Sequence, residues 1–72
     1  METYRNLSGN SGVQAYEIGP AYIIVKFSGT ARTYIYSYRK AGSDHVEQMK
    51  VLARQGRGLG TYINKYVRDL YD

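Results

Sequence analysis

The residues best suited to chemistry form a glycine-rich stretch near the C-terminal third of the chain. Residues 54–61 have the sequence Arg-Gln-Gly-Arg-Gly-Leu-Gly-Thr, with a glycine at every second position. Glycine lets the backbone approach a ligand closely, and a guanidinium group matches the geometry of a phosphate. A helix that begins at this stretch adds free amides to the site. The residues expected to hold a phosphate group are Arg54, Arg57, Gly58, Gly60 and Thr61.

The same stretch can also be a plain connector between two helices. Gly56 can end the first helix in the left-handed conformation, and the later glycines can form a tight turn. The stretch is not a P-loop, because no Lys-Ser or Lys-Thr pair follows its last glycine. The two interpretations are compatible, and the sequence leaves both open.

Tyrosine is the second unusual feature, with nine copies against one phenylalanine and no tryptophan. A tyrosine ring packs while its hydroxyl reaches water, a ligand or a partner. Most of these rings are expected in the core, but rings at the rim of a sheet can stack on a base. The rings expected against a base or sugar are Tyr36, Tyr38 and Tyr62. Arg39 follows the same predicted strand and can neutralise a phosphate.

Catalysis is not expected from this composition. The chain has one histidine and no cysteine, and its six carboxylates are scattered along the sequence. Residues 44–47, Asp-His-Val-Glu, fit the start of a helix better than a metal site. We therefore expect a protein that is not an enzyme and that has no catalytic residues, no metal and no other cofactor.

Three strands are expected to position these residues. The alternating or β-rich segments are residues 13–18, 21–28 and 32–38, separated by turns at Gly19-Pro20 and Gly29-Thr30. Residues 1–12 contain one aliphatic side chain, Leu7, and are expected to form a flexible or irregular lead-in. The domain proper is then residues 13–72.

The hairpin at Gly29-Thr30 fixes a register for the second and third strands. It places Val25 opposite Tyr34 and Ile23 opposite Tyr36. The expected core face comprises Ala21, Ile23, Val25, Phe27, Tyr34, Tyr36 and Tyr38. The other face, mixed in character, comprises Tyr22, Ile24, Lys26, Thr33, Ile35 and Ser37. In the first strand, Tyr16 and Ile18 are expected on one face, and Val13 and Ala15 on the other.

Two helices are expected after the strands. Asp44 can cap the first helix, with Glu47 completing a capping box, and Gly56 ends it. Thr61 can cap the second helix. The expected apolar stripes are Val46, Met49, Leu52 and Ala53 on the first helix, and Tyr62, Ile63, Tyr66, Val67 and Leu70 on the second. The predicted fold is α+β: a three-stranded antiparallel β-meander followed by two helices packed on one face.

Length and charge limit the partners. Seventy-two residues make one small domain, and ten basic against six acidic residues give a net charge of +4, which favours an anionic partner. The first five residues show no apolar signal segment, so we expect a cytoplasmic protein without a membrane partner. The small core and the mixed sheet face favour a homo-oligomer.

Two motifs resemble a known family. Tyr-Ile-Tyr at residues 34–36 follows a strand and a Ser-Gly turn, and residues 60–68 have the sequence Gly-Thr-Tyr-Ile-Asn-Lys-Tyr-Val-Arg. Over residues 11–71 this pattern resembles the KTSC domain, a module at the C-terminus of some lysyl-tRNA synthetases and in stand-alone bacterial proteins. The basic residues at 39–42 and the additional glycines at 56–60 depart from the family. The resemblance implies a suspected role in RNA binding and no catalytic residues.

These observations favour a non-catalytic binding protein for a phosphate-bearing ligand. The basic residues are dispersed and the glycine stretch is short, so a small nucleotide-like molecule is the first choice. Such a protein suits sensing or sequestration, which in a phage would be counter-defence. The alternatives are an RNA or single-stranded nucleic-acid binding module, and a protein-interaction or inhibitor module.

Overall fold

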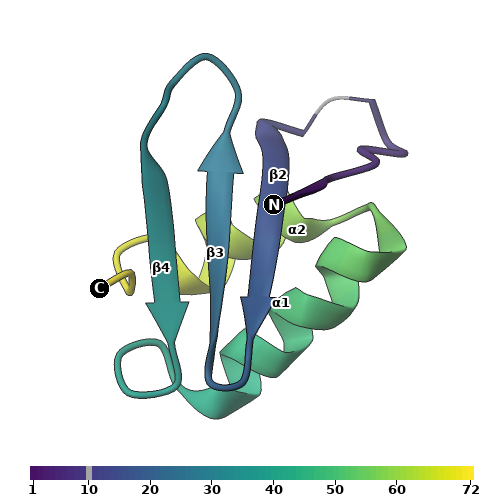
Figure 1. The fold of residues 1–72 in the computed structure, drawn as a ribbon. Helices are drawn as coiled ribbons and strands as arrows, with labels where there is room; N and C mark the ends of the chain where they lie inside the picture. Colours follow the sequence, from purple (N-terminus) through teal and green to yellow (C-terminus); the bar gives the residue numbers. More distant parts are fainter. Residues whose placement is uncertain (10) are drawn as a thin grey trace.

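The computed structural model describes residues 1–9 and 11–72; Asn10, part of the expected lead-in, lies outside them. An antiparallel sheet with the strand order β1-β2-β3-β4 packs one face against two helical segments (Figure 1). The strands are β1 (Glu2–Thr3), β2 (Val13–Gly19), β3 (Tyr22–Phe27) and β4 (Thr33–Ser37). The helical segments are α1 (Ser43–Gln55), α2 (Leu59–Tyr62) and the π-helix η1 (Ile63–Val67), which continues α2. The predicted α+β fold is confirmed, with one more strand than expected.

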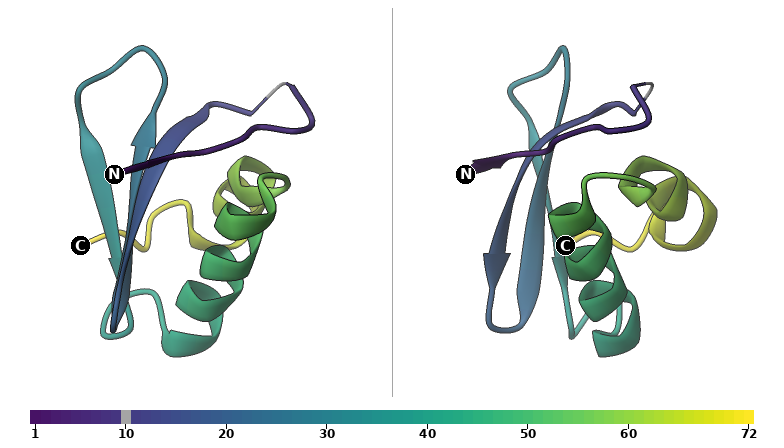
Figure 2. Two further views of the ribbon diagram at one scale, coloured as in Figure 1. Left: turned by 45° about the vertical axis from the view of Figure 1, so that its right-hand side comes forward. Right: turned by 90° about the vertical axis from the view of Figure 1, so that its right-hand side faces the viewer.

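The register of β3 and β4 is the one predicted from the sequence. Val25 pairs with Tyr34 and Ile23 pairs with Tyr36, so their side chains share the face toward the helices. Both helical segments lie on that side of the sheet in both views of Figure 2. The core between sheet and helices contains Ile23, Val25, Tyr36, Val46, Met49, Ala53, Leu59, Ile63 and Val67. No helix in the described part of the chain is long and apolar enough to cross a membrane.

The face of β2 differs from the prediction because the strand contains a bulge. Val13 pairs with Phe27 but Ala15 pairs with Lys26, so one extra residue stands between them in β2. The bulge shifts the alternation by one position, and Val13 and Tyr16 are both buried on the core face. The expected separation of these two residues onto opposite faces is therefore wrong.

The turns also differ in detail. Gly19 pairs with Tyr22, so Pro20 and Ala21 form the first turn, and Ala21 is exposed there instead of lying on the core face. The second ladder ends at Lys26 and Thr33, which leaves a loop over residues 28–32 where a two-residue turn was predicted. The Ser28 amide donates to the carbonyl of Gly12 at 2.8 Å, which draws this loop toward the start of β2.

The predicted side-chain caps of both helices are wrong. Gly42, with φ 99°, occupies the N-cap of α1 and offers no side chain, and Asp44 lies within the first turn. The second helix begins at Leu59, two residues before Thr61, after Gly58 in the left-handed conformation with φ 82°. The predicted left-handed Gly56 at the end of α1 is confirmed, with φ 79°.

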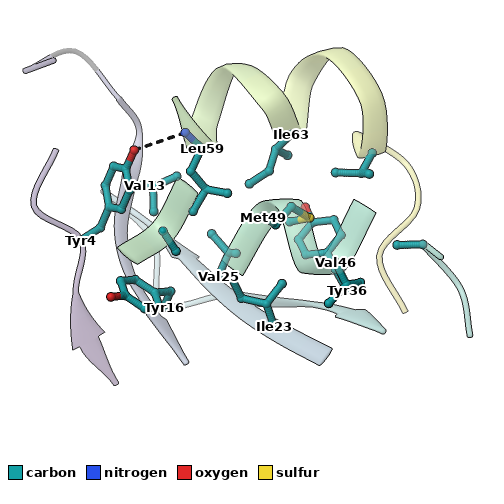
Figure 3. Close-up of a cluster of buried hydrophobic side chains, with 13 residues drawn as sticks. Tyr4, Val13, Tyr16, Ile23, Val25, Tyr36, Val46, Met49, Leu59 and Ile63 are labelled. Atoms are coloured by element: carbon teal, nitrogen blue, oxygen red, sulfur yellow. Dashed lines mark hydrogen bonds between the residues drawn. The ribbon is translucent and has the colours of Figure 1, made fainter. Parts of the chain in front are cut away.

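A tyrosine from the N-terminal segment takes the place of a cap on α2. The Leu59 amide donates to the hydroxyl oxygen of Tyr4 at 3.2 Å, and both residues are buried (Figure 3). The same segment contacts the end of α1, because Arg5 Nη2 donates to the Arg54 carbonyl at 2.6 Å and the Leu7 amide to that of Gly56 at 2.7 Å. The expected irregular lead-in therefore contains a short strand, a core residue and three bonds to the helix connector.

Replacing the Tyr4 hydroxyl tests this contact. Tyr4→Phe leaves the buried Leu59 amide without its partner, so the free energy of unfolding should fall by about 1–3 kcal/mol. Urea unfolding followed by circular dichroism measures the change. Tyr66→Phe is the matched control, because Tyr66 is 52% exposed, and a change within about 0.5 kcal/mol is expected there. Equal losses in both variants would contradict the capping role.

Candidate ligand-binding groove

Two adjoining hollows lie between the sheet, the N-terminal segment and the second helical segment. The first, the polar hollow, has a volume of about 280 Å³ and is lined by Ser8, Ser11, Gly12, Phe27, Gly58, Gly60, Thr61 and Asn64. The second, the aromatic hollow, has a volume of about 320 Å³ and is lined by Phe27, Thr30, Tyr34, Tyr36, Ile63, Asn64, Arg68, Asp69 and Tyr71. Phe27 and Asn64 line both, so the two hollows adjoin at these side chains, and together they are called the groove.

The polar hollow depends on a close approach of the Gly60 backbone to the side chain of Ser11. A Cβ at Gly60 would lie 2.9 Å from Ser11 Oγ, so only glycine fits at this position without moving Ser11. Ser11 is held on both sides, because its amide donates to Asn6 Oδ1 at 3.1 Å and its Oγ accepts the Val13 amide at 3.1 Å. The hollow is therefore built on the contact between the N-terminal segment and the first turn of α2.

The aromatic hollow is built from rings packed edge to face. The Tyr34 ring lies 5.5 Å from the Phe27 ring and 4.8 Å from the Tyr71 ring, with interplanar angles of 77° and 87°. The guanidinium of Arg32 lies 5.3 Å from the centre of the Tyr34 ring. These contacts hold the rings in a defined arrangement at the wall of the aromatic hollow.

The C-terminal residues hold Tyr71 in place through the edge of β4. The Asp72 amide donates to the Ile35 carbonyl at 2.7 Å, as a further strand would. Asp72 Oδ1 accepts the Ser37 amide at 3.2 Å and the Ser37 hydroxyl at 2.8 Å. One residue thus fixes the segment that forms the outer wall of the aromatic hollow.

The π-helix brings two polar side chains to the groove. Asn64 lies in η1 at the junction of the hollows, and Arg68 directly follows η1 and lines the aromatic hollow. Arg68 is exposed, and among residues 1–9 and 11–72 it forms no ion pair. π-helical turns have strained hydrogen bonding and are frequent at functional sites. The groove therefore combines hydroxyls, an amide, aromatic rings and one available guanidinium.

Four of the nine site residues predicted from the sequence lie in this groove. Gly58, Gly60 and Thr61 line the polar hollow, and Tyr36 lines the aromatic hollow. The predicted arginines are elsewhere: Arg54, Arg57 and Arg39 are exposed and line neither hollow. The structure therefore separates the predicted phosphate-binding backbone from the arginines expected beside it.

Tyr38 belongs to a contact between β4 and α1. Its hydroxyl donates to the carboxylate of Glu47, which forms an ion pair with Lys50 at 2.8 Å. The hydrogen bond to Glu47 raises the pKa of Tyr38, and the bonds from Lys50 and Tyr38 lower the pKa of Glu47. The Lys50 ammonium is 5.3 Å from the centre of the Tyr38 ring. Tyr38 thus helps to hold α1 on the sheet and does not reach the groove.

Tyr62 is partly buried and contacts His45 of α1. Its hydroxyl lies 2.7 Å from His45 Nδ1, and its ring lies 4.8 Å from the ring of Tyr66. Burial, followed by the nearby Tyr66 and Asp44, raises the pKa of Tyr62. These contacts give Tyr62 a role in helix packing, and it lines neither hollow.

Eleven of the fifteen groove residues were not predicted as site residues: Ser8, Ser11, Gly12, Phe27, Thr30, Tyr34, Ile63, Asn64, Arg68, Asp69 and Tyr71. One pair could have been found from the helical periodicity of the sequence, because Asn64 and Arg68 are four residues apart and share a helix face. For the others, contacts over long sequence distances bring the residues together, and no local sequence pattern indicates that they share a site. Among the described residues, no group of three histidine, aspartate or glutamate side chains converges to hold a metal.

Comparison with known proteins adds no relative to these observations. No family model, no curated protein and no solved structure matches this chain. The resemblance to the KTSC domain therefore stays a prediction based on the residues at 34–36 and 60–68.

The buried phenol of Tyr36 predicts a pH effect. Burial, followed by the neighbouring Tyr34 and Tyr71, raises the pKa of Tyr36 from 10.0 to about 12. The unfolded chain loses this proton first, so the free energy of unfolding should fall as pH rises from about 10 to about 12. Tyr36→Phe should make this slope shallower than in the unsubstituted protein.

The measurement combines phenolate absorbance with urea unfolding at each pH. In the folded protein, at least one phenol should ionise only near pH 12. Full ionisation of all nine tyrosines near pH 10 while the protein is folded would contradict the buried position of Tyr36.

Proposed function

We propose that this protein binds a small nucleotide-like, phosphate-bearing ligand in the groove without converting it, and serves to sense or sequester that ligand. The observation that carries the proposal is the adjacency of the two hollows, one lined mainly by hydroxyls, glycines and an amide, the other by aromatic rings and Arg68. A nucleotide has the same division into a polar sugar-phosphate part and a flat ring. The volumes, about 280 and 320 Å³, suit parts of this size.

The aromatic hollow suits the base. Phe27, Tyr34 and Tyr71 are half-buried or exposed at its wall and are ordered by edge-to-face contacts. Contact between a base and an aromatic side chain contributes roughly 1–3 kcal/mol to binding. Because the rings are already ordered, little of this energy is lost in arranging them.

The polar hollow and Arg68 suit the sugar and phosphate. Ser8, Ser11 and Thr61 supply hydroxyl donors, and none of the described residues lining this hollow carries a carboxylate that would repel an anion. Arg68, at the other side of Asn64, supplies the positive charge that the predicted Arg54 and Arg57 were expected to give. Its planar guanidinium can donate two parallel bonds to a phosphate.

Binding without conversion is favoured by what lines the groove. Across both hollows the described residues include one carboxylate, Asp69, and no imidazole. A hydrolytic reaction needs a positioned base, and often an acid or a metal as well. One carboxylate beside an arginine is more suited to accept a hydrogen bond from a sugar hydroxyl.

The first test asks whether Arg68 contributes to nucleotide binding. Native mass spectrometry with a mixture of ribonucleoside mono- and diphosphates, dinucleotides and short RNA should show an adduct of nucleotide mass. For the nucleotide selected, calorimetry should give an affinity at least about tenfold weaker in Arg68→Gln, because a charge-assisted hydrogen bond is lost. Arg57→Gln is the matched control and should bind as the unsubstituted protein does.

Other outcomes of this experiment are equally informative. A loss in Arg57→Gln alone would move the site to the connector between α1 and α2. RNA complexes that dissociate steeply with added salt, without a nucleotide adduct, would replace the proposal with nucleic-acid binding. No adduct of either kind would overturn the proposal and favour a protein partner.

The second test concerns the polar hollow. Thr61→Val removes a hydroxyl at nearly constant shape and should weaken nucleotide binding by roughly three- to tenfold. Thr33→Val makes the same chemical change on the opposite face of the sheet, where Thr33 is exposed, and should leave binding unchanged. Equal affinities for both variants, measured by calorimetry, would exclude Thr61 from the site.

A further inference from the structure

One face of the sheet has no helix against it. Both helical segments pack on the side of Ile23, Val25 and Tyr36, and no helix lies on the opposite side, where the N-terminus projects past β2 (Figure 2). The residues that β2, β3 and β4 contribute to this outer face are Ala15, Glu17, Tyr22, Ile24, Lys26, Thr33, Ile35 and Ser37, and Thr3 of β1 lies beside Ala15. The outer face is independent of the groove, because none of these residues lines either hollow.

The centre of the outer face is apolar. Ile24 lies directly opposite Ile35 in the ladder, and Tyr22 lies on the same face two residues from Ile24. Ile35, at the middle of the edge strand β4, is 43% exposed. β-branched side chains paired across two strands form a flat apolar surface that is stabilised when another surface covers it.

The charges on this face are balanced and unpaired. Glu17 lies opposite Ile24 on one side, and Lys26 lies two residues beyond Ile24 along β3. They form no ion pair with each other; Lys26 Nζ instead donates to the neutral Gln14 Oε1 at 2.6 Å. With one acid and one base the face is neutral, although the chain carries a net charge of +4. A neutral face does not suit a nucleic acid, whose binding needs positive charge.

The apolar centre and the two charges of the outer face are complementary to those of the same face on a second copy. When two copies meet face to face around a two-fold axis near Ile24, the isoleucines contact each other. Glu17 of each copy then lies on the side of Lys26 of the other, so the symmetry forms two equivalent ion pairs. The edge of β4 is a poorer contact for a second copy, because Asp72 already occupies the Ile35 carbonyl and the Ser37 amide.

We propose that the outer face binds a second copy of this chain and forms a two-fold symmetric dimer. The contact is small: three strands about 4.8 Å apart, with about five residues each at about 3.4 Å of rise, offer on the order of 250 Å² per copy. Two faces bury about 500 Å², less than the roughly 1,200 Å² of stable complexes. The dimer is therefore weak and dissociates on dilution.

Charge exchange tests both the face and the symmetry. Sedimentation equilibrium from micromolar to near-millimolar protein should show a monomer–dimer equilibrium. Glu17→Lys and Lys26→Glu should each lower the association constant at least about tenfold, because each places like charges across the contact. The double variant Glu17→Lys/Lys26→Glu should restore it to within about threefold, since the pairs re-form with reversed signs.

The same set of variants contains a control for the effect of net charge on association. Glu17→Lys raises the net charge and Lys26→Glu lowers it, so a loss in both cannot come from overall repulsion. Lys40→Glu, at an exposed position outside the face, changes the net charge as Lys26→Glu does and should leave the association constant unchanged. Circular dichroism confirms that each variant is folded. A wild-type protein that stays monomeric at the highest concentration would overturn the proposal, as would a double variant as weak as the single ones.

Discussion

The contact between Tyr4 and Leu59 connects the parts of the molecule that are furthest apart in sequence. A helix that starts after a left-handed glycine has no side chain of its own to accept its first amide, and Tyr4 supplies an oxygen at 3.2 Å. The ring that carries this oxygen is itself part of the core. The N-terminal segment is thereby fixed against the helix connector, and the polar hollow lies where Ser11 then meets Gly60. The groove therefore depends on the hydrogen bond by which Tyr4 caps the start of the second helix.

Local pattern was sufficient for the faces of β3 and β4, and insufficient for β2 and for the starts of the two helices. Alternation along β3 and β4 fixed which side chains face the core, because a shift of one residue would expose every apolar group. The bulge in β2 was not predictable, because Val13 and Tyr16 are compatible with either face of the sheet. Only the tertiary packing determines which face each of them takes. The helix starts failed for a related reason. Both begin after glycines, Gly42 and Gly58, so the expected caps Asp44 and Thr61 fall inside the first turns.

The candidate site also has a part that could be predicted from the local sequence and a part that could not. The backbone part, Gly58 to Thr61, could be predicted because the requirement for glycine at a close approach is a local property. The charged part could not, because an arginine contributes only where the fold directs it. Arg57 is adjacent to Gly58 in the sequence but lines neither hollow. Arg68 directly follows η1 and lines the aromatic hollow. Tyrosine count likewise indicated a ring-rich site, while the contacts of Tyr38 and Tyr62 assign them to helix packing.

The two faces of the sheet separate the two proposed contacts. The groove uses side chains on the helix side, including Phe27 and Tyr34, whereas the outer face uses the alternate residues of the same strands. A dimer formed through the outer face leaves both grooves open and directs them away from each other. Ile35 is the one shared point: its carbonyl holds Asp72, and therefore the wall at Tyr71, while its side chain lies at the centre of the outer face. Because backbone and side chain act separately there, ligand binding and self-association can each occur without the other.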